Sequence, residues 1–188
     1  MKTKINKNFH QLLTVLDCDG IVINFWKAFC LAAGHKYILN CASWDYYTQT
    51  PWFKQTWTAI KDDKDFWSTL PILNLPEDIN FNVHSFMTSI PPKMESARKH
   101  NLYNVHKFPR IPIIVTYNKL KELTAMNADL LIDNKHETVQ EINEAYERGE
   151  TKCRALKYCP YYLDEEPTIW DLHDLTKVGE KLKELKWI

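Results

Sequence analysis

The chain has 188 residues, with 24 Lys and Arg against 24 Asp and Glu, and 45% of its residues are hydrophobic. This length and composition are typical of one globular domain with room for a modest insertion. The formal net charge of zero argues against a protein that binds duplex nucleic acid by neutralising phosphates. No stretch is long and apolar enough to span a membrane, and the first residues lack the apolar core of a secretory signal, so we expect a cytoplasmic protein.

The use of glycine and cysteine excludes several common sites. The chain has 4 glycines, and no two lie close enough to form a loop that cradles phosphate groups. This excludes Walker-type nucleotide binding and the dinucleotide-binding fingerprint. The 5 cysteines are scattered without C-x-x-C spacing, which predicts reduced thiols rather than a zinc or redox site.

Short apolar runs bounded by polar residues predict the strands. In chain order they lie at 12–17, 83–88, 111–116 and 129–133, with further candidates at 153–158 and 168–170. Helical patterns lie at 92–102, 119–126, 135–147 and 173–186, whereas Pro91-Pro92 and 158–167 are typical of loops. Alternation of strand and helix predicts an α/β fold, a parallel sheet with helices on both faces. In such sheets, ligands bind outside the carboxyl ends of the strands.

The segment 27–78 interrupts this alternation, because it is too long for a crossover and has a composition of its own. Its part 44–67 is dense in aromatic residues, and we expect a small helical cap above the sheet. The predicted domains are a core of 1–26 and 79–188 and an inserted cap of 27–78. The rings either pack the cap's own core or face a ligand. We expect Trp44, Tyr46 and Tyr47, which lie in a polar turn, to face the cavity in preference to Trp57.

One basic run stands out in the balanced chain, at 93–110. The run contains one acidic residue, Glu95, and the basic residues Lys93, Arg98, Lys99, Lys107 and Arg110. We interpret the run as a solvated face. It leaves a polymeric substrate open, although the net charge argues against one.

Polar residues follow four successive predicted strands at the points where the strands end. They are Asp17-Cys18-Asp19-Gly20, Thr88-Ser89, Thr116 with Lys119, and Asp133-Asn134. Asp17 and Asp19 lie two residues apart in extended chain and can face one cavity, while Gly20 allows a sharp turn. Two close carboxylates repel unless a cation neutralises them, and oxygen ligands select a hard ion such as Mg²⁺. A magnesium ion with open positions is the usual partner of a phosphate, to which a hydroxyl and a lysine then donate.

Each of these features alone is common in proteins. An Asp-x-Asp-Gly sequence, a Thr-Ser pair and a lysine near the start of a helix often serve only as turn, capping or solvated residues. Their order on consecutive strands favours a site that handles phosphate.

Four segments resemble the four motifs of the haloacid dehalogenase-like (HAD) phosphatases, in the same order: LDCDG (16–20), FMTS (86–89), Lys119 in VTYNKLKEL, and LLIDN (130–134). The likeness is greatest to the 5'(3')-deoxyribonucleotidase branch, which has a cap inserted between its first and second motifs. The segment DFWSTLP (65–71) also resembles the end of that cap. The resemblance covers roughly residues 12–147 and implies a Rossmann-like HAD core with a small helical cap.

The resemblance implies a role for each matching residue. Asp17 would attack phosphorus and become an aspartyl-phosphate, while Asp19 would protonate the leaving oxygen and later activate water. Thr88, with Ser89 beside it, would bind the phosphoryl group, and Lys119 would offset the negative charge. The residues that would hold Mg²⁺ are Asp17, Asp19 through its backbone carbonyl, and Asp133.

Asn134 departs from the family pattern, which most often has Asp-Asp at the fourth motif. The first acid of that pair is retained as Asp133, so a magnesium site remains with one less negative charge, and an Asn can orient a metal-bound water. Our leading hypothesis is a magnesium-dependent hydrolase of phosphomonoesters whose substrate is a nucleoside monophosphate, chiefly a deoxyribonucleotide.

Two alternatives stay open at this point. The same chemistry could act on a 3'-phosphate at a nucleic-acid end or on another small phosphomonoester. Asn134 could instead mark a phosphate-binding module with weakened catalysis. We expect a small-molecule partner and no membrane partner, and the sequence leaves the base, the sugar and the oligomeric state open.

Overall fold

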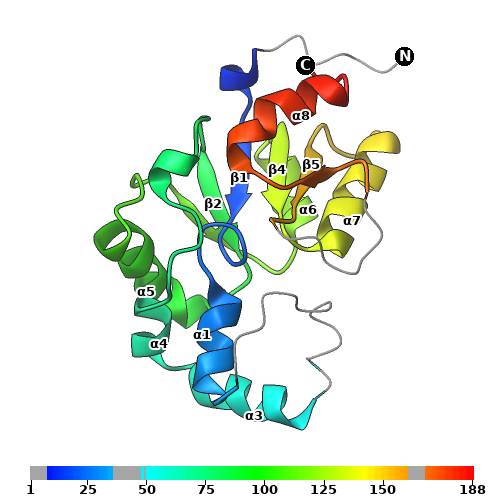
Figure 1. Cartoon of the computed structure of the whole chain (residues 1–188). Coiled ribbons are helices and arrows are strands. Elements are labelled where there is room, and N and C mark those ends of the chain that lie inside the picture. The colour runs from blue at the N-terminus through cyan, green and yellow to red at the C-terminus, as the bar shows by residue number, and fades with distance from the viewer. Residues whose placement is uncertain (1–7, 36–47, 49, 161–167) are drawn as a thin grey trace.

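The computed structural model describes residues 8–35, 48, 50–160 and 168–188. Within them a parallel sheet of six strands has the order β3-β2-β1-β4-β5-β6 (Figure 1). The strands are β1 (Thr14–Asp17), β2 (Ser85–Thr88), β3 (Ile113–Val115), β4 (Leu130–Asp133), β5 (Arg154–Tyr158) and β6 (Asp171–Leu172). Strand order therefore runs outward in opposite directions from β1 and β4. This reversal is the point at which open α/β sheets form a ligand crevice.

Helices cover both faces of the sheet, because successive residues of a strand point to opposite sides. Leu16 and Phe86 lie in the apolar cluster that includes α5 and α8, whereas Val15 and Met87 lie in the cluster that includes α6 and α7. The α-helices are α1 (Phe25–Ala32), α3 (Pro51–Ile60), α4 (Lys64–Ser68), α5 (Glu95–Lys99), α6 (Lys119–Ala125), α7 (His136–Glu147) and α8 (Val178–Glu184). The predicted α/β architecture is thus confirmed. None of the described helices is both long and apolar enough to cross a lipid bilayer.

Short helices of other types extend this framework and refine the predicted elements. They are η1 (Phe9–Gln11), η2 (Pro76–Asp78), η3 (Pro92–Met94), a π-helical segment η4 (His100–Val105) and η5 (Leu175–Lys177). The predicted helix 92–102 is therefore three consecutive pieces, and Pro92 begins the first of them rather than lying in a loop. A proline suits that position because it lacks the N–H that the first turn leaves unpaired.

The predicted strand at 168–170 is wrong. The backbone N–H of Asp171 donates to the carbonyl of Thr168 at 3.2 Å, and the Thr168 hydroxyl donates to the Asp171 carboxylate at 2.7 Å. These bonds close a turn, and the two-residue strand β6 begins only at Asp171.

The helices α1, α3 and α4 lie together beyond the carboxyl ends of β1 and β2 (Figure 1). The chain leaves for them and returns along paired segments: Asn24 N–H donates to the Pro71 carbonyl at 2.8 Å, and Leu73 N–H donates to the Val22 carbonyl at 2.9 Å. The side chains of Phe25 and Trp67 stack at 5.4 Å and join the same apolar cluster as the sheet. This packing sets the three helices against the turn that follows β1.

Asn143 of α7 replaces a missing strand neighbour at β5. Strand β6 is too short to reach Ala155, and the Asn143 side chain instead donates to the Ala155 carbonyl at 2.9 Å and accepts from its N–H at 2.8 Å. Both bonds are buried, so each backbone group would lose its partner without this amide.

We therefore expect Asn143→Ala to lower the free energy of unfolding by about 2 kcal/mol, because two buried backbone groups lose their partners. Urea unfolding measures the difference. Gln140→Ala, on the exposed face of the same helix, is the control and should change stability by less than about 0.5 kcal/mol. Equal effects of the two substitutions would contradict this role of Asn143.

Candidate active site

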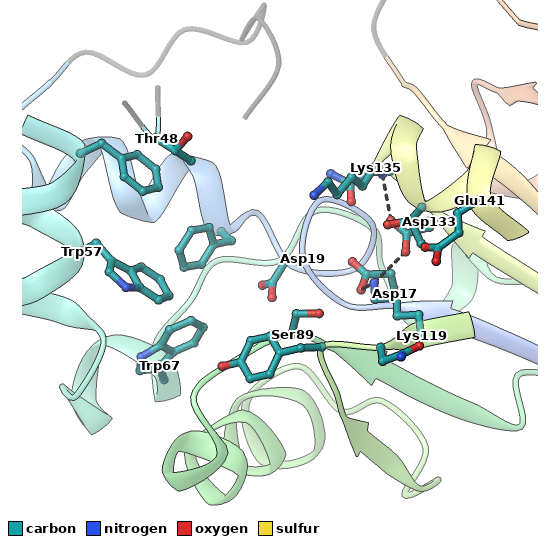
Figure 2. A pocket seen from close by; sticks show the side chains of 16 residues that line it. Asp17, Asp19, Thr48, Trp57, Trp67, Ser89, Lys119, Asp133, Lys135 and Glu141 are labelled. Atoms are coloured by element: carbon teal, nitrogen blue, oxygen red, sulfur yellow. Dashed lines mark hydrogen bonds and ion pairs between the residues drawn. The ribbon is translucent and has the colours of Figure 1, made fainter. Parts of the chain in front are cut away.

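A cavity of about 590 Å³ opens at the carboxyl ends of the strands, between the sheet and α3 and α4 (Figure 2). Polar residues that follow the central strands form one side of it: Asp17, Asp19, Ser89, Lys119 and Asp133. Aromatic rings from the inserted helices form the other side: Phe25, Phe53, Trp57 and Trp67. The cavity thus joins a charged end to an apolar wall, a combination that suits a small polar ligand with a flat apolar part.

Lys119 bridges two carboxylates at the charged end. Its Nζ lies 2.5 Å from Oδ1 of Asp17 and 2.6 Å from Oδ2 of Asp133, and all three side chains are largely buried. Lys119 is the first residue of α6, whose start is fixed by the Asn118 side chain accepting from the N–H of Lys121. The loop after β3 therefore delivers the ammonium to the carboxyl ends of β1 and β4.

Lys119 and Asp17 shift each other's titration. Burial raises the pKa of Asp17 to about 7 although Lys119 opposes the rise, and the carboxylates of Asp133 and Asp19 add to it. Burial opposes the charged form of Lys119, but Asp133 and Asp17 together raise the pKa of its ammonium above the ordinary value. The ammonium of Lys119 thus stabilises the charged form of the Asp17 carboxylate, which burial disfavours.

Gly20 forms the turn that separates Asp17 from the inserted helices. Its φ of +81° is in the region that favours glycine, and a Cβ there would clash with the side-chain amide of Asn134. Asn134 therefore lies directly against the turn of the Asp-x-Asp-Gly segment. A larger residue at position 20 would displace the asparagine.

Asp19 is held apart from the Asp17–Lys119–Asp133 cluster by other donors. The Thr88 hydroxyl donates to Oδ2 of Asp19 at 3.2 Å, and Nη2 of Arg98 lies 2.7 Å from Oδ1 and 2.9 Å from Oδ2. Thr88 is fully buried, whereas Ser89 lines the cavity and donates its hydroxyl to the Thr116 carbonyl at 2.8 Å. Of this predicted pair, Ser89 is the residue exposed to the cavity.

Arg98 corrects the interpretation of the basic run as a solvated face. Its side chain is 0% exposed, although Lys93 and Lys99 near it are exposed. The buried residues of this helical segment recur every three or four positions, at Met94, Ala97, Arg98, Asn101 and Leu102. That helical spacing was the signal in the sequence that could have placed Arg98 inward.

The cysteine between the two aspartates takes no part in this chemistry. Cys18 is fully buried, and burial raises the pKa of its thiol, so it stays neutral. Cys18, Cys30 and Cys153 are free thiols.

The aromatic wall contains other rings than those predicted to bind substrate. Trp44, Tyr46 and Tyr47 lie outside the described residues, and Trp57, expected to face the cavity less, lines it. Tyr117, in the loop after β3, adds a further ring to the lining of the cavity, and its hydroxyl donates to the Ile90 carbonyl at 3.1 Å. Nothing in the sequence pattern had singled out Tyr117.

The described residues contain no cluster of three or more His, Cys, Asp and Glu side chains that could hold a metal ion. The donors that remain are the two carboxylates of Asp17 and Asp133 and the backbone of the turn. Magnesium commonly uses one or two carboxylates and completes its octahedron with water and phosphate oxygens. This all-oxygen set is compatible with Mg²⁺ and incompatible with a closed zinc site.

The sequence matches no protein-family model and no curated protein. Among solved structures, the chain is similar to a HAD-superfamily hydrolase of subfamily IA, variant 1, from Geobacter sulfurreducens. The two share 10% identity and a TM-score of 0.53, over 94% of this chain and 99% of that chain. At this identity the likeness concerns the fold alone. The chain therefore has the Rossmann-like α/β fold of a HAD-superfamily hydrolase, as its motifs implied.

Proposed function

We propose that the protein is a magnesium-dependent phosphomonoester hydrolase that acts through an aspartyl-phosphate, with nucleoside monophosphates as substrates. The observation that carries this proposal is the Asp17–Lys119–Asp133 cluster at the reversal of strand order, facing a cavity with an aromatic wall. The fold is one that a HAD-superfamily hydrolase has, which supports the roles that the motif resemblance implies for these residues.

The first step is attack by Asp17 on phosphorus. A carboxylate oxygen forms the new P–O bond as the bond from phosphorus to the leaving oxygen breaks, which leaves an aspartyl-phosphate. Lys119 contacts Asp17 and faces the charge that gathers on the transferring phosphoryl group. Asp19 gives its proton to the leaving oxygen, and its carboxylate then takes a proton from the water that attacks the aspartyl-phosphate.

Mg²⁺ fits the remaining donors of the site. Asp17, the backbone carbonyl of Asp19 and Asp133 would hold it, and when bound it would neutralise phosphate charge and orient the phosphoryl group. Such an ion would also favour the charged form of Asp17, whose burial raises its pKa. Asn134, beside the turn, is placed to orient a water rather than to add a fourth negative charge.

The aromatic wall supports a substrate that carries a base. The cavity volume of about 590 Å³ is that of a small-molecule site, which supports a mononucleotide over a polymer. A nucleobase stacked on an aromatic side chain gains about 1–3 kcal/mol, whereas a phosphate without a base gains nothing there. Together with the motif resemblance, this wall supports a 5'(3')-deoxyribonucleotidase as the specific form of the activity.

Asp17→Asn should abolish turnover while the fold is kept, because an amide does not accept the phosphoryl group. We expect kcat to fall at least about a thousand-fold, equivalent to about 4 kcal/mol of barrier. Phosphate release from a nucleoside monophosphate measures it, and thermal melting shows that the fold survives. Asp62→Asn, at an exposed carboxylate paired with Lys93, is the control and should keep full activity. More than a few per cent of the wild-type rate in Asp17→Asn would refute the aspartyl-phosphate.

Asp133→Ala should raise the magnesium concentration that gives half-maximal rate by about tenfold or more, because one of two carboxylate ligands is lost. Asn134→Asp has the same shape as wild type and should lower that concentration or leave it unchanged, since it adds a negative charge. Activity titrated with Mg²⁺, and suppressed by EDTA, provides the measurement. Magnesium dependence in Asp133→Ala equal to that of wild type would remove this residue from the metal site.

Trp57→Ala should lower kcat/KM for a nucleoside monophosphate about ten- to a hundred-fold, because a stacking surface for the base is removed. Ribose 5-phosphate has the same leaving group without a base, and its kcat/KM should change little. Trp52→Ala is the matched control on the same helix: Trp52 packs on Phe29 and does not line the cavity. It should lower thermal stability and affect both substrates alike. An unchanged substrate ratio in Trp57→Ala would contradict base stacking on this ring.

A further inference from the structure

Arg98 is a buried cation whose only described partner among acidic side chains is Asp19. It lies on α5, its side chain is 0% exposed, and Nη2 contacts both carboxylate oxygens of Asp19 at 2.7 and 2.9 Å. The Asp19 side chain is 22% exposed and lines the cavity. Arg98 itself does not line the cavity, but it contacts two residues that do, Asp19 through its charge and Trp67 through its planar face.

The burial of this guanidinium is unfavourable for stability. Among the described residues, Nε and Nη1 of Arg98 have no hydrogen-bond partner. A buried donor without a partner costs about 1–3 kcal/mol, and apolar side chains of similar volume often stabilise a fold as well as a buried ion pair does. Packing alone thus gives no reason for an arginine here, whereas its contact with Asp19 does.

The guanidinium has little freedom to move away from Asp19. It lies over the ring of Trp67, 5.4 Å from the centroid, and the Trp67 indole N–H donates to the Ile60 carbonyl at 3.1 Å. One turn further along, the Asn101 amide donates to the carbonyls of Ser68 at 3.2 Å and Leu70 at 2.9 Å. These bonds join the helix of Arg98 to the end of α4. The position of Nη2 is accordingly fixed from two sides.

The donors on Asp19 are distributed unequally between its oxygens. Oδ2 accepts from both the Thr88 hydroxyl and Nη2 of Arg98, whereas Oδ1 accepts from Nη2 alone. Oδ1 therefore has more remaining hydrogen-bonding capacity than Oδ2 toward a group in the cavity. Figure 2 shows Asp19 between the Asp17 side of the cavity and the rings of Trp57 and Trp67, where a leaving group would lie.

We propose that Arg98 is a positioning residue, which holds Asp19 in the orientation that delivers its proton to the leaving oxygen. The inference rests on the proposed function. The proton passes from Oδ1 of Asp19 to the leaving oxygen as the P–O bond breaks, and Arg98 keeps all its protons throughout. A general acid must lie within hydrogen-bond reach of the oxygen that it protonates, so an Asp19 that is free to rotate loses much of its effect.

The test is the dependence of Arg98→Met on the leaving group. A nucleoside needs a proton to depart, whereas nitrophenol departs readily as an anion. We expect kcat/KM for a nucleoside monophosphate to fall about ten- to a hundred-fold, as a 1 Å misplacement of a catalytic group does, and kcat/KM for nitrophenyl phosphate to fall less than about threefold. The ratio kcat/KM is the right quantity because it ends at leaving-group departure and excludes the later hydrolysis of the aspartyl-phosphate.

Two further variants separate positioning from a structural role. Lys99→Met removes an exposed cation from the same helix and should leave both substrates unchanged. Arg98→Lys keeps the charge but loses the planar group over Trp67, so it should show the same selective loss to a smaller degree. It also supplies the test if Arg98→Met fails to fold. Equal losses for the two substrates in the folded Arg98 variants would overturn the proposal.

A combination with Asp19→Asn distinguishes this inference from the proposed function. In the Asp19→Asn background, Arg98→Met should change kcat/KM for the nucleotide less than about twofold, because residues that act as a unit are not additive. Losses that multiply would overturn the positioning role. If Asp19→Asn alone shows no selective loss for the nucleotide, the acid role of Asp19 fails. If it does and neither Arg98 variant does, only the role of Arg98 fails.

Discussion

The contact of one ammonium with two buried carboxylates organises this end of the molecule. Asp17 and Asp133 end adjacent strands, and without a cation between them their charges would repel in a place with little water. Lys119 comes from a third strand's loop, so the contact ties the ends of β1, β3 and β4 together. The same geometry leaves oxygen ligands beside a fixed positive charge, which is what binding and transfer of a phosphoryl group require.

Around this cluster, the inserted helices and the core are joined through side chains rather than through a separate cap core. Phe25, Trp67 and Leu70 belong to the same buried cluster as the sheet residue Leu16. Trp67 lies under Arg98 and also lines the cavity, while Arg98 contacts Asp19. The wall that would meet the substrate and the acid that would protonate its leaving group are thus adjacent parts of one packed unit.

The sequence predicted the part of this arrangement that depends on the chain order of short motifs. Buried parallel strands need continuous apolar residues, and a polar residue that follows such a run lies at the carboxyl end of the strand. This pattern predicted the positions of Asp17, Lys119 and Asp133. Arg98 and Tyr117 were not found, because their roles arise from contacts between segments distant in the chain. The positive charges at 93–110 suggested a solvated face, but the position of a residue around the helix determines whether its side chain is buried, as it is for Arg98. The turn at 168–171 was predicted as a strand because of the β-propensity of Thr168, Ile169 and Trp170. Hydrogen bonds between Thr168 and Asp171 outweigh that propensity.

Under the proposed function, the charge balance of the site is compatible with asparagine at position 134. The carboxylates of Asp17, Asp19 and Asp133 contact the two cations Lys119 and Arg98. Two further lining residues, Lys135 and Glu141, have opposite charges that cancel in the sum. With all three carboxylates ionised, the site carries about one net negative charge, which would attract a divalent cation and become about one positive charge when that cation is bound. A phosphate dianion would then be attracted rather than repelled. An aspartate in place of Asn134 would strengthen the attraction for the metal but would also leave the loaded site without positive charge. Under the proposed function, Asn134 would thus exchange some metal affinity for phosphate affinity, and Arg98 contributes to this balance because it offsets the charge of Asp19 from inside the fold.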